Sequence, residues 1–256
     1  MVLGWWNLLL AQPSYKEVDV KDGGTIRGTV RLSGDVPKVE KMEISKDNKQ
    51  CGRAKPSPRL QVGKNNGVRY AIVSIEGLLE GKKMVSNTKL TLDQRKCVYE
   101  PHVMILPLGT LLEITNSDPI LHNVHAYQAG ATVRSVFNIA QPIKGQRTSI
   151  KPTLLNKLGL VLTTCDAGHP WMSGYIMVAD HPYYAVTDEN GSFLLDHVPP
   201  GIYKLKMWHE GVAITEKEME KDKVKKYHYE EPYEMMKEVT VPPSGNVTVD
   251  FELVLR

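Results

Sequence analysis

The sequence lacks features that would assign it to several broad classes of protein. Beyond the first 14 residues, no apolar run approaches the length of a membrane-spanning helix. Lysines alternate with glutamates in runs such as 216-EKEMEKDKVKK-226, and no basic stripe of the kind that binds nucleic acid is present. We therefore expect no membrane-spanning segment in the body of the chain and no nucleic-acid partner.

Cysteine is scarce, with three residues at Cys51, Cys97 and Cys165. An odd number in an exported protein suggests one disulfide and one thiol with another role. Cys165 shares one short loop with His169 and Met172, whereas Cys51 and Cys97 lie in the polar stretches 47-DNKQCG-52 and 93-DQRKCVYEPH-102, so we predict a Cys51–Cys97 disulfide. Two buried free thiols in a cytosolic protein remain the alternative.

The first residues, 1-MVLGWWNLLLAQPS-14, include an apolar stretch that is too short to span a bilayer and lacks the basic residues of a full signal peptide. Three interpretations stay open: the remnant of a signal peptide, a short membrane-surface anchor, or an ordinary first strand. We expect membrane association only through this segment, and a periplasmic or extracellular location for the chain.

Short strand patterns make up most of the remaining sequence. Apolar or alternating runs bounded by Gly, Pro, Asn or Asp predict strands at 25–34, 68–77, 110–115, 122–127, 158–164, 173–180, 192–198, 201–208 and 246–255. Only 213–238 has a helix-friendly composition, and its charged run 216–226 fits a solvated helix or hairpin face. The expected fold class is all-β, with two β-sandwiches.

The segment 186-VTDENGSFLLDHVPPGIYKLKMWHEG-211 resembles the carboxypeptidase regulatory-like family of small transthyretin-like sandwiches. That family usually opens with strands similar to 24-GTIRGTVRL-32 and 71-AIVSIEG-77, which lie far upstream in this chain. We therefore predict a discontinuous sandwich from 23–83 and 181–256, with 84–180 as a second domain inserted at a loop, where insertions are tolerated.

Within the predicted insert, 109-GTLLEITNSDPILHNVHAY-127 is followed by the loop 165-CDAGHPWM-172. Together these segments resemble the cupredoxin family of copper electron-transfer proteins. The resemblance implies copper as the cofactor and a ligand set of His122, Cys165, His169 and Met172. It also implies that Asn123 does not bind the metal itself and that its region supplies hydrogen bonds to the Cys165 sulfur. A thiolate, two neutral imidazoles and a weak axial Met suit both oxidation states of copper.

The spacing departs from many mononuclear cupredoxins, because three residues, 166-DAG-168, separate Cys165 from His169. The copper-A domain of cytochrome oxidase has this spacing, but its second ligand cysteine would fall at Val161, so a dinuclear centre is not supported. The colour of a copper site here, blue, green or red, is left open.

Other residues near the loop have less definite roles. Pro170 and Trp171, with the apolar stretch before His122, are expected to form a docking patch for a redox partner, unless Trp171 packs inward and closes the site. Strand alternation places His125 on the opposite face from His122. His102 and His181 are weaker metal candidates.

These features predict an exported mononuclear copper protein that transfers single electrons, not an enzyme, with the second sandwich as a scaffold. The implied partner is a redox protein such as a c-type cytochrome or an oxidoreductase complex. A copper chaperone or store, and a metal-free structural or binding subunit, are the alternatives. A hydrolase built on Cys165 and His169 is disfavoured because nothing in the sequence supplies an orienting acid or an oxyanion hole.

Overall fold

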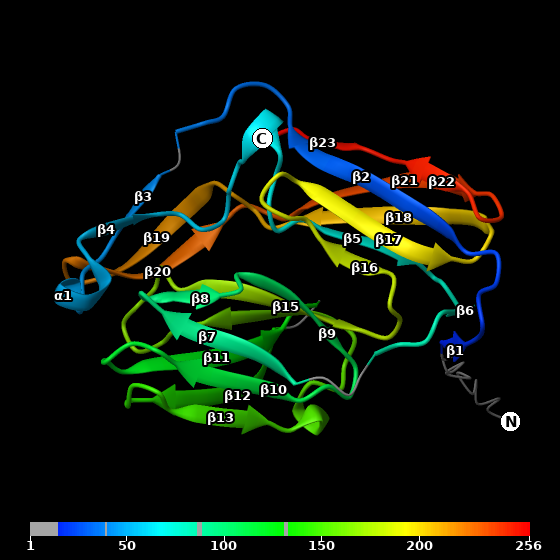
Figure 1. Cartoon of the computed structure of the whole chain (residues 1–256). Helices are drawn as coiled ribbons and strands as arrows, with labels where there is room; N and C mark the ends of the chain where they lie inside the picture. The colour runs from blue at the N-terminus through cyan, green and yellow to red at the C-terminus, as the bar shows by residue number, and fades with distance from the viewer. Residues whose placement is uncertain (1–14, 39, 86–88, 131–132) are drawn as a thin grey trace, which may run out of the picture.

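The computed structural model describes residues 15–38, 40–85, 89–130 and 133–256, so the apolar start of the chain, with its three interpretations, lies outside the described residues. The described part is nearly all β-strand, and its strands form two β-sandwiches that lie one above the other in Figure 1. The all-β prediction is therefore confirmed. Among the described residues, no helix is long and apolar enough to cross a membrane.

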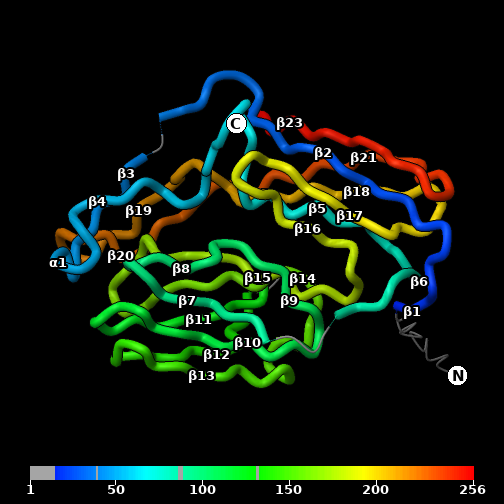
Figure 2. Tube along the Cα trace, viewed as in Figure 1, coloured from blue at the N-terminus to red at the C-terminus, as the bar shows by residue number. Residues whose placement is uncertain are grey.

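The first sandwich is built from strands between residues 90 and 179, the green part of the trace in Figure 2. One sheet has the order β13-β10-β7-β8, comprising Arg147–Ile150, Leu112–Asn116, Leu90–Arg95 and Val98–Glu100. The other has the order β12-β11-β14-β15-β9, comprising Arg134–Gln141, His122–Gln128, Gly159–Thr164, Ser173–Ala179 and Val103–Pro107.

The strands of the second sandwich come from the chain segments before and after the first sandwich. One sheet has the order β16-β5-β18-β21, comprising Tyr184–Val186, Ile72–Glu76, Gly201–His209 and Tyr233–Val241. The other pairs β17 (Ser192–Val198), β2 (Gly24–Leu32) and β22 (Asn246–Thr248), and β23 (Phe251–Leu253) also pairs with β2. The turn at Asp188–Gly191 therefore joins strands of opposite sheets.

Three small elements flank the sandwiches: the pair β1 (Lys16–Glu17) and β6 (Glu80–Gly81), the pair β3 (Lys41–Glu43) and β4 (Ala54–Pro56) with helix α1 (Asn48–Cys51) between them, and the hairpin of β19 (Ile214–Glu220) and β20 (Lys223–Tyr229). Short 3-10 turns lie at Lys64–Asn66 and Pro152–Leu154. The helix-friendly region 213–238 thus contains strands, and the hairpin interpretation of its charged run is the correct one.

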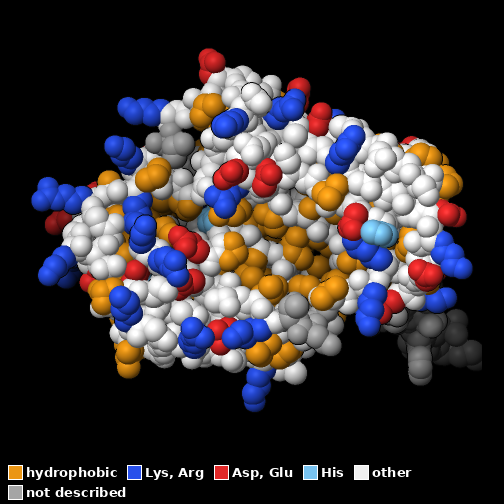
Figure 3. All heavy atoms as spheres, viewed as in Figure 1, with side chains coloured by type: hydrophobic (Ala, Val, Ile, Leu, Met, Phe, Trp, Pro, Cys, Tyr) orange, Lys and Arg blue, Asp and Glu red, His pale blue; other side chains and the backbone are white. Residues whose placement is uncertain are grey.

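Each sandwich has its own apolar core, and a third buried cluster of Ile72, Val103 and Trp208 lies where the two meet. On the face seen in Figure 3, apolar side chains gather along this boundary. The first core includes the buried residues Leu92, Val124, Cys165 and Met172, so the predicted metal loop is packed into a dry interior. The loop lies at one end of the sheet, where β11 begins with His122 and β14 ends just before Cys165.

Candidate metal centre

Three of the four predicted ligands converge in the first sandwich. His122 is the first residue of β11, while Cys165 and His169 lie on the loop between β14 and β15. One ligand atom from each residue lies within 4.8 Å of the others. His122 Nδ1 is 3.0 Å from His169 Nδ1, and Cys165 Sγ is 3.5 Å from His169 Nδ1. All three side chains are buried.

Each imidazole is held from behind by a carboxylate. His122 Nε2 donates to Asp118 Oδ2 at 2.9 Å, and His169 Nε2 donates to Asp47 Oδ2 at 2.9 Å. Because a carboxylate only accepts, the ring proton of each histidine lies on Nε2. The two Nδ1 lone pairs then face each other at 3.0 Å, so a cation bound between them would relieve their repulsion.

The electrostatic setting keeps these groups neutral in the metal-free chain. Burial lowers the pKa of His122 and of His169, and this effect exceeds the opposing effect of the nearby carboxylates. Burial also raises the pKa of the Cys165 thiol to about 11, although a hydrogen bond from the Asn123 amide acts in the opposite direction. A metal ion that binds here must therefore displace the thiol proton.

Asp118 remains an anion although it is buried. Burial alone would raise its pKa, but hydrogen bonds from the Cys97 amide, from His122 and from the Lys96 amide together lower it. The two amides donate to Oδ2 at 2.7 Å and to Oδ1 at 2.8 Å, respectively. The carboxylate is thus fixed by the β7–β8 turn before it holds the imidazole.

Asn123 joins the two ligand-bearing segments. Its backbone N–H donates to Cys165 Sγ at 3.4 Å, and its side-chain oxygen accepts from the Ala167 amide at 3.1 Å. Gly168 has a φ of 87°, which allows the loop to turn back within the three residues that separate Cys165 from His169. The left-handed Gly168 therefore accommodates the three-residue spacing between Cys165 and His169.

Met172 and Trp171 both point into the protein. Met172 is buried in the same core cluster as Cys165, and its amide donates to the His169 carbonyl at 2.9 Å. Trp171 is 1% exposed, and its Nε1 donates to the Cys97 carbonyl at 3.1 Å. The predicted docking patch of Pro170 and Trp171 is therefore wrong for Trp171, because the indole fills the interior. Pro170 is partly exposed.

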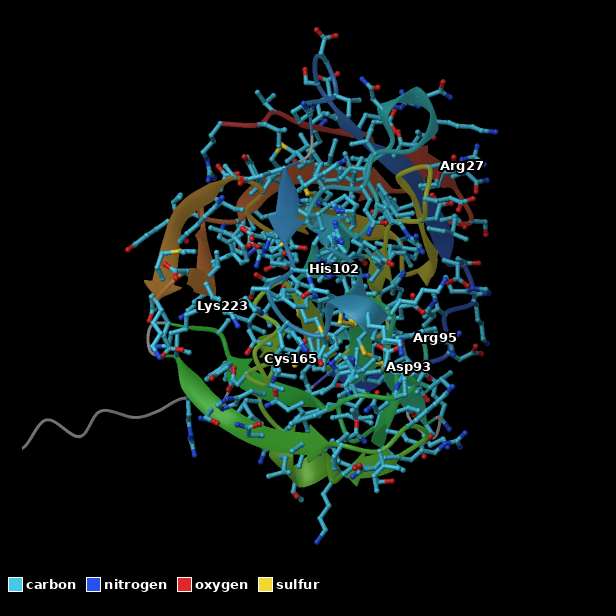
Figure 4. The ribbon with its side chains drawn as sticks, turned by 90° about the vertical axis from the view of Figure 1, so that its left-hand side faces the viewer. Arg27, Asp93, Arg95, His102, Cys165 and Lys223 are labelled. Atoms are coloured by element: carbon cyan, nitrogen blue, oxygen red, sulfur yellow. A yellow bond between two sulfur atoms is a disulfide. The ribbon has the colours of Figure 1, made fainter. Side chains whose placement is uncertain are left out.

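The other histidines considered from sequence lie away from the three converging ligands. His125 faces the opposite side of β11, as alternation predicted, and contacts Asp166 and Ser135. His102 is buried between the Ser173 carbonyl and the Glu210 carboxylate. His181 lies among tyrosine rings. Figure 4 labels both His102 and Cys165, viewed from the side of the molecule that carries α1.

A second group of candidate ligands shares His122 but cannot bind in the same way. Cys97, Asp118 and His122 lie close together, yet the Cys97 sulfur is bonded to Cys51. The predicted Cys51–Cys97 disulfide is thus confirmed, and Cys165 is a free, buried cysteine. Cys97, Asp118 and His122 therefore form no second metal site; their closeness shows that the disulfide lies beside the first one.

Sequence reasoning missed the two carboxylates behind the imidazoles. Asp118 lies four residues before His122 in 116-NSDPILH-122, so its position near that ligand had a local signal. Asp47 lies 122 residues from His169, and its only signal is that Cys51, four residues later, was predicted to pair with Cys97. Tyr99, also missed, donates from its hydroxyl to the Asn123 carbonyl at 2.6 Å.

Comparison with known proteins gives partial matches to solved structures and nothing more. No family model matches the chain, and no curated protein matches it. Similar solved structures include a purple cupredoxin from Nitrosopumilus maritimus, with 22% identity over 35% of this chain and 99% of that chain, at a TM-score of 0.30.

Two further similar structures are a copper-containing nitrite reductase from Thermus scotoductus SA-01 and a reduced Cu(I) form of an amicyanin mutant. The first is 23% identical over 40% of this chain and 24% of that chain, and the second is 23% identical over 37% and 86%; both have a TM-score of 0.30. All three matches cover less than half of this chain.

Proposed function

We propose that this chain is an exported mononuclear copper protein that transfers single electrons between redox partners. The observation that carries the proposal is the convergence of His122 Nδ1, His169 Nδ1 and Cys165 Sγ, with the opposite nitrogen of each imidazole donating to a carboxylate. Two facing lone pairs and a thiol in a dry interior fit a soft or borderline metal ion. This donor set favours copper over a hard cation such as Mg²⁺.

In this proposal His122, Cys165 and His169 hold the metal, and Met172 is the fourth ligand from the same loop. Bound copper would supply a one-electron Cu(II)/Cu(I) couple. The chain fixes the imidazoles through their Nε2 hydrogen bonds, excludes water by burial, and directs the Asn123 amide at the Cys165 sulfur. Little of this framework has to move when an electron arrives, because it is held by strands and hydrogen bonds.

The disulfide supports an oxidising compartment, periplasmic or extracellular. We propose a redox protein, such as a c-type cytochrome or an oxidoreductase complex, as the partner. The sandwich of 23–83 and 181–256 would be a carboxypeptidase regulatory-like scaffold. In support of this, strands that precede and follow the first sandwich in sequence pair in the second sandwich.

A titration of metal-free protein with Cu(II), followed by visible absorption and EPR, tests the proposal. The wild type is expected to show an intense sulfur-to-copper charge-transfer band that saturates at one copper per chain, and Cys165→Ser is expected to lose it. Asp166→Asn is the matched control, because Asp166 neighbours Cys165 but contacts His125. A wild type that binds neither Cu(II) nor Cu(I) would leave a metal-free structural role.

Copper storage or delivery is the second candidate, and one observation favours it. His122 and His169 are both 0% exposed, so neither imidazole offers an edge on the surface through which a partner could exchange electrons directly. A storage protein would bind Cu(I) tightly and give no stable, coloured Cu(II) form. The same titration, repeated with Cu(I) and a competing chelator, separates the two functions.

A further inference from the structure

A segment from the second sandwich's part of the chain covers the candidate metal centre. Residues 41–56, comprising β3, α1 and β4, precede β5 in sequence but pack on the first sandwich. We call this segment the cap. Its side chains Met42, Ile44 and Cys51 belong to the same buried cluster as Cys165 and Met172. In Figures 1 and 2 it lies at the left edge of the molecule, around α1.

The cap is fastened at several points around the ligands. The Cys51–Cys97 disulfide ties α1 to the β7–β8 turn, and the Gln50 side chain donates to Asp118 Oδ1 at 3.1 Å. Lys46 Nζ donates to the Ala167 carbonyl, inside the loop that carries Cys165 and His169, at 2.5 Å. The cap therefore contacts both ligand-bearing segments.

Asp47 is the cap residue that reaches a ligand. Its backbone is left-handed, with a φ of 53°, and its carbonyl accepts from the amides of Gln50 and Cys51 at 2.9 Å each. This conformation presents Asp47 Oδ2 to His169 Nε2 at 2.9 Å. The Asp47 side chain is 29% exposed while the imidazole is 0% exposed, so Asp47 stands between His169 and solvent.

We infer that Asp47 is a positioning residue for His169 and sets the relative affinity of the site for the two oxidation states of copper. This inference rests on the proposed function. As an acceptor, the carboxylate keeps the ring proton on Nε2 and leaves Nδ1 free for the metal. As an anion, it favours the more highly charged Cu(II), because opposite charges attract more strongly when the ion carries a second charge.

An anion that favours Cu(II) lowers the reduction potential, and the cap also keeps the His169 edge from direct contact with a partner. A partner would therefore approach over the cap surface, where Asp47 is the group nearest to this ligand. Removal of Asp47 should raise the reduction potential of the site.

The test compares Asp47→Asn, which removes the charge and keeps an acceptor, with Asp166→Asn as a matched control. Asp166 is an acidic neighbour of Cys165 whose carboxylate contacts His125. For Asp47→Asn we expect about a tenfold rise in the affinity for Cu(I) relative to Cu(II), which equals about 59 mV for a one-electron couple. A reduction potential for Asp47→Asn equal to that of the wild type would overturn the inference.

A readout without copper separates this inference from the proposed function. Long-range ¹H–¹⁵N NMR of the metal-free wild type should show His169 with its proton on Nε2, and Asp47→Ala should give a mixture of tautomers, while His122 stays unchanged. An unchanged His169 tautomer in Asp47→Ala would refute the positioning role even in a chain that binds copper. Failure of the wild type to bind copper would refute the proposed function and leave the tautomer result to decide what Asp47 does.

Discussion

The raised pKa of the Cys165 thiol makes metal affinity depend on pH. With a pKa of about 11, set mainly by burial, the thiol is almost fully protonated at neutral pH. Displacement of that proton at about pH 7 costs about 5 kcal/mol, at 1.36 kcal/mol for each pH unit below the pKa. His122 and His169 have lowered pKa values and contribute no proton above about pH 7.

The sign and size of the effect follow from this balance. Binding releases one proton, from Cys165, so affinity rises with pH by about tenfold for each unit, or about a hundredfold between pH 7 and pH 9. The metal-free chain shows the opposite trend in stability. Its folded state holds the thiol proton more tightly than the unfolded chain, so the stability contributed by this group is lost as pH rises from about 9 towards 11.

Competition between the protein and a chromogenic Cu(I) chelator, repeated across this pH range, measures the effect. Cys165→Ser is the control, because it removes the titrating ligand and should give a flat profile. An affinity for the wild type that changes less than about twofold per pH unit would mean that the thiol is already ionised in the metal-free chain, and would refute the reasoning from burial.

Three other perturbations have expected outcomes. Replacing both disulfide cysteines, Cys51 and Cys97, by serine should lower the free energy of unfolding of the first sandwich by about 4 kcal/mol, because the disulfide closes a loop of 46 residues. Denaturant titration measures this loss, and a loss below about 1 kcal/mol would contradict the role of the disulfide in attaching the cap. Asp118→Ala leaves the His122 and Cys97 N–H groups without their acceptor and should cost roughly 3 kcal/mol in the same assay, and a cost below about 0.5 kcal/mol would contradict its role. Gly168→Ala should strain the loop, because φ is 87° and the new Cβ would lie 2.9 Å from the Lys46 side chain; an unchanged melting temperature and visible spectrum would show that the loop adapts.

Much of the strand pattern could be predicted because it is local. Alternating runs such as β2 and β18 were predicted to within about two residues of their bounds. The run 246–255 was predicted as one strand but forms β22 and β23, with a break at Val249 and Asp250, whose side chain accepts hydrogen bonds from Thr29. Here a tertiary contact interrupts a continuous apolar pattern.

Several strands escaped prediction; β9, 103-VMILP-107, was missed although its residues are apolar, whereas β12 has a weak apolar signal. β12 carries a mostly exposed or half-buried pattern, so its sequence, 134-RSVFNIAQ-141, does not alternate cleanly. The segment 213–238 has a helix-friendly composition, and its charged run left helix and hairpin open; it forms the hairpin β19–β20, whose Tyr227 packs in the first core. Tertiary pairing overrides local propensity in such solvated segments.

The ligands and their supporting groups differ in the same way. Cys165 and His169 share one loop, and His122 begins a predicted strand, so a short motif indicated all three. Asp47 reaches His169 through the fold of a distant segment, and no spacing in the sequence encodes that contact. The inward orientation of Trp171 likewise depends on the Cys97 carbonyl, which only the folded disulfide region brings to the indole.

X-ray absorption spectroscopy of the copper-loaded protein, in its oxidised and reduced forms, would reveal the atoms bound to the metal. One sulfur and two imidazole nitrogens should lie close to copper in both forms, with little change between them. In Cys165→Ser the short copper–sulfur bond should be absent from the spectrum. Copper bound only by nitrogen and oxygen in the wild type, or a ligand set that changes when the metal is reduced, would contradict the account.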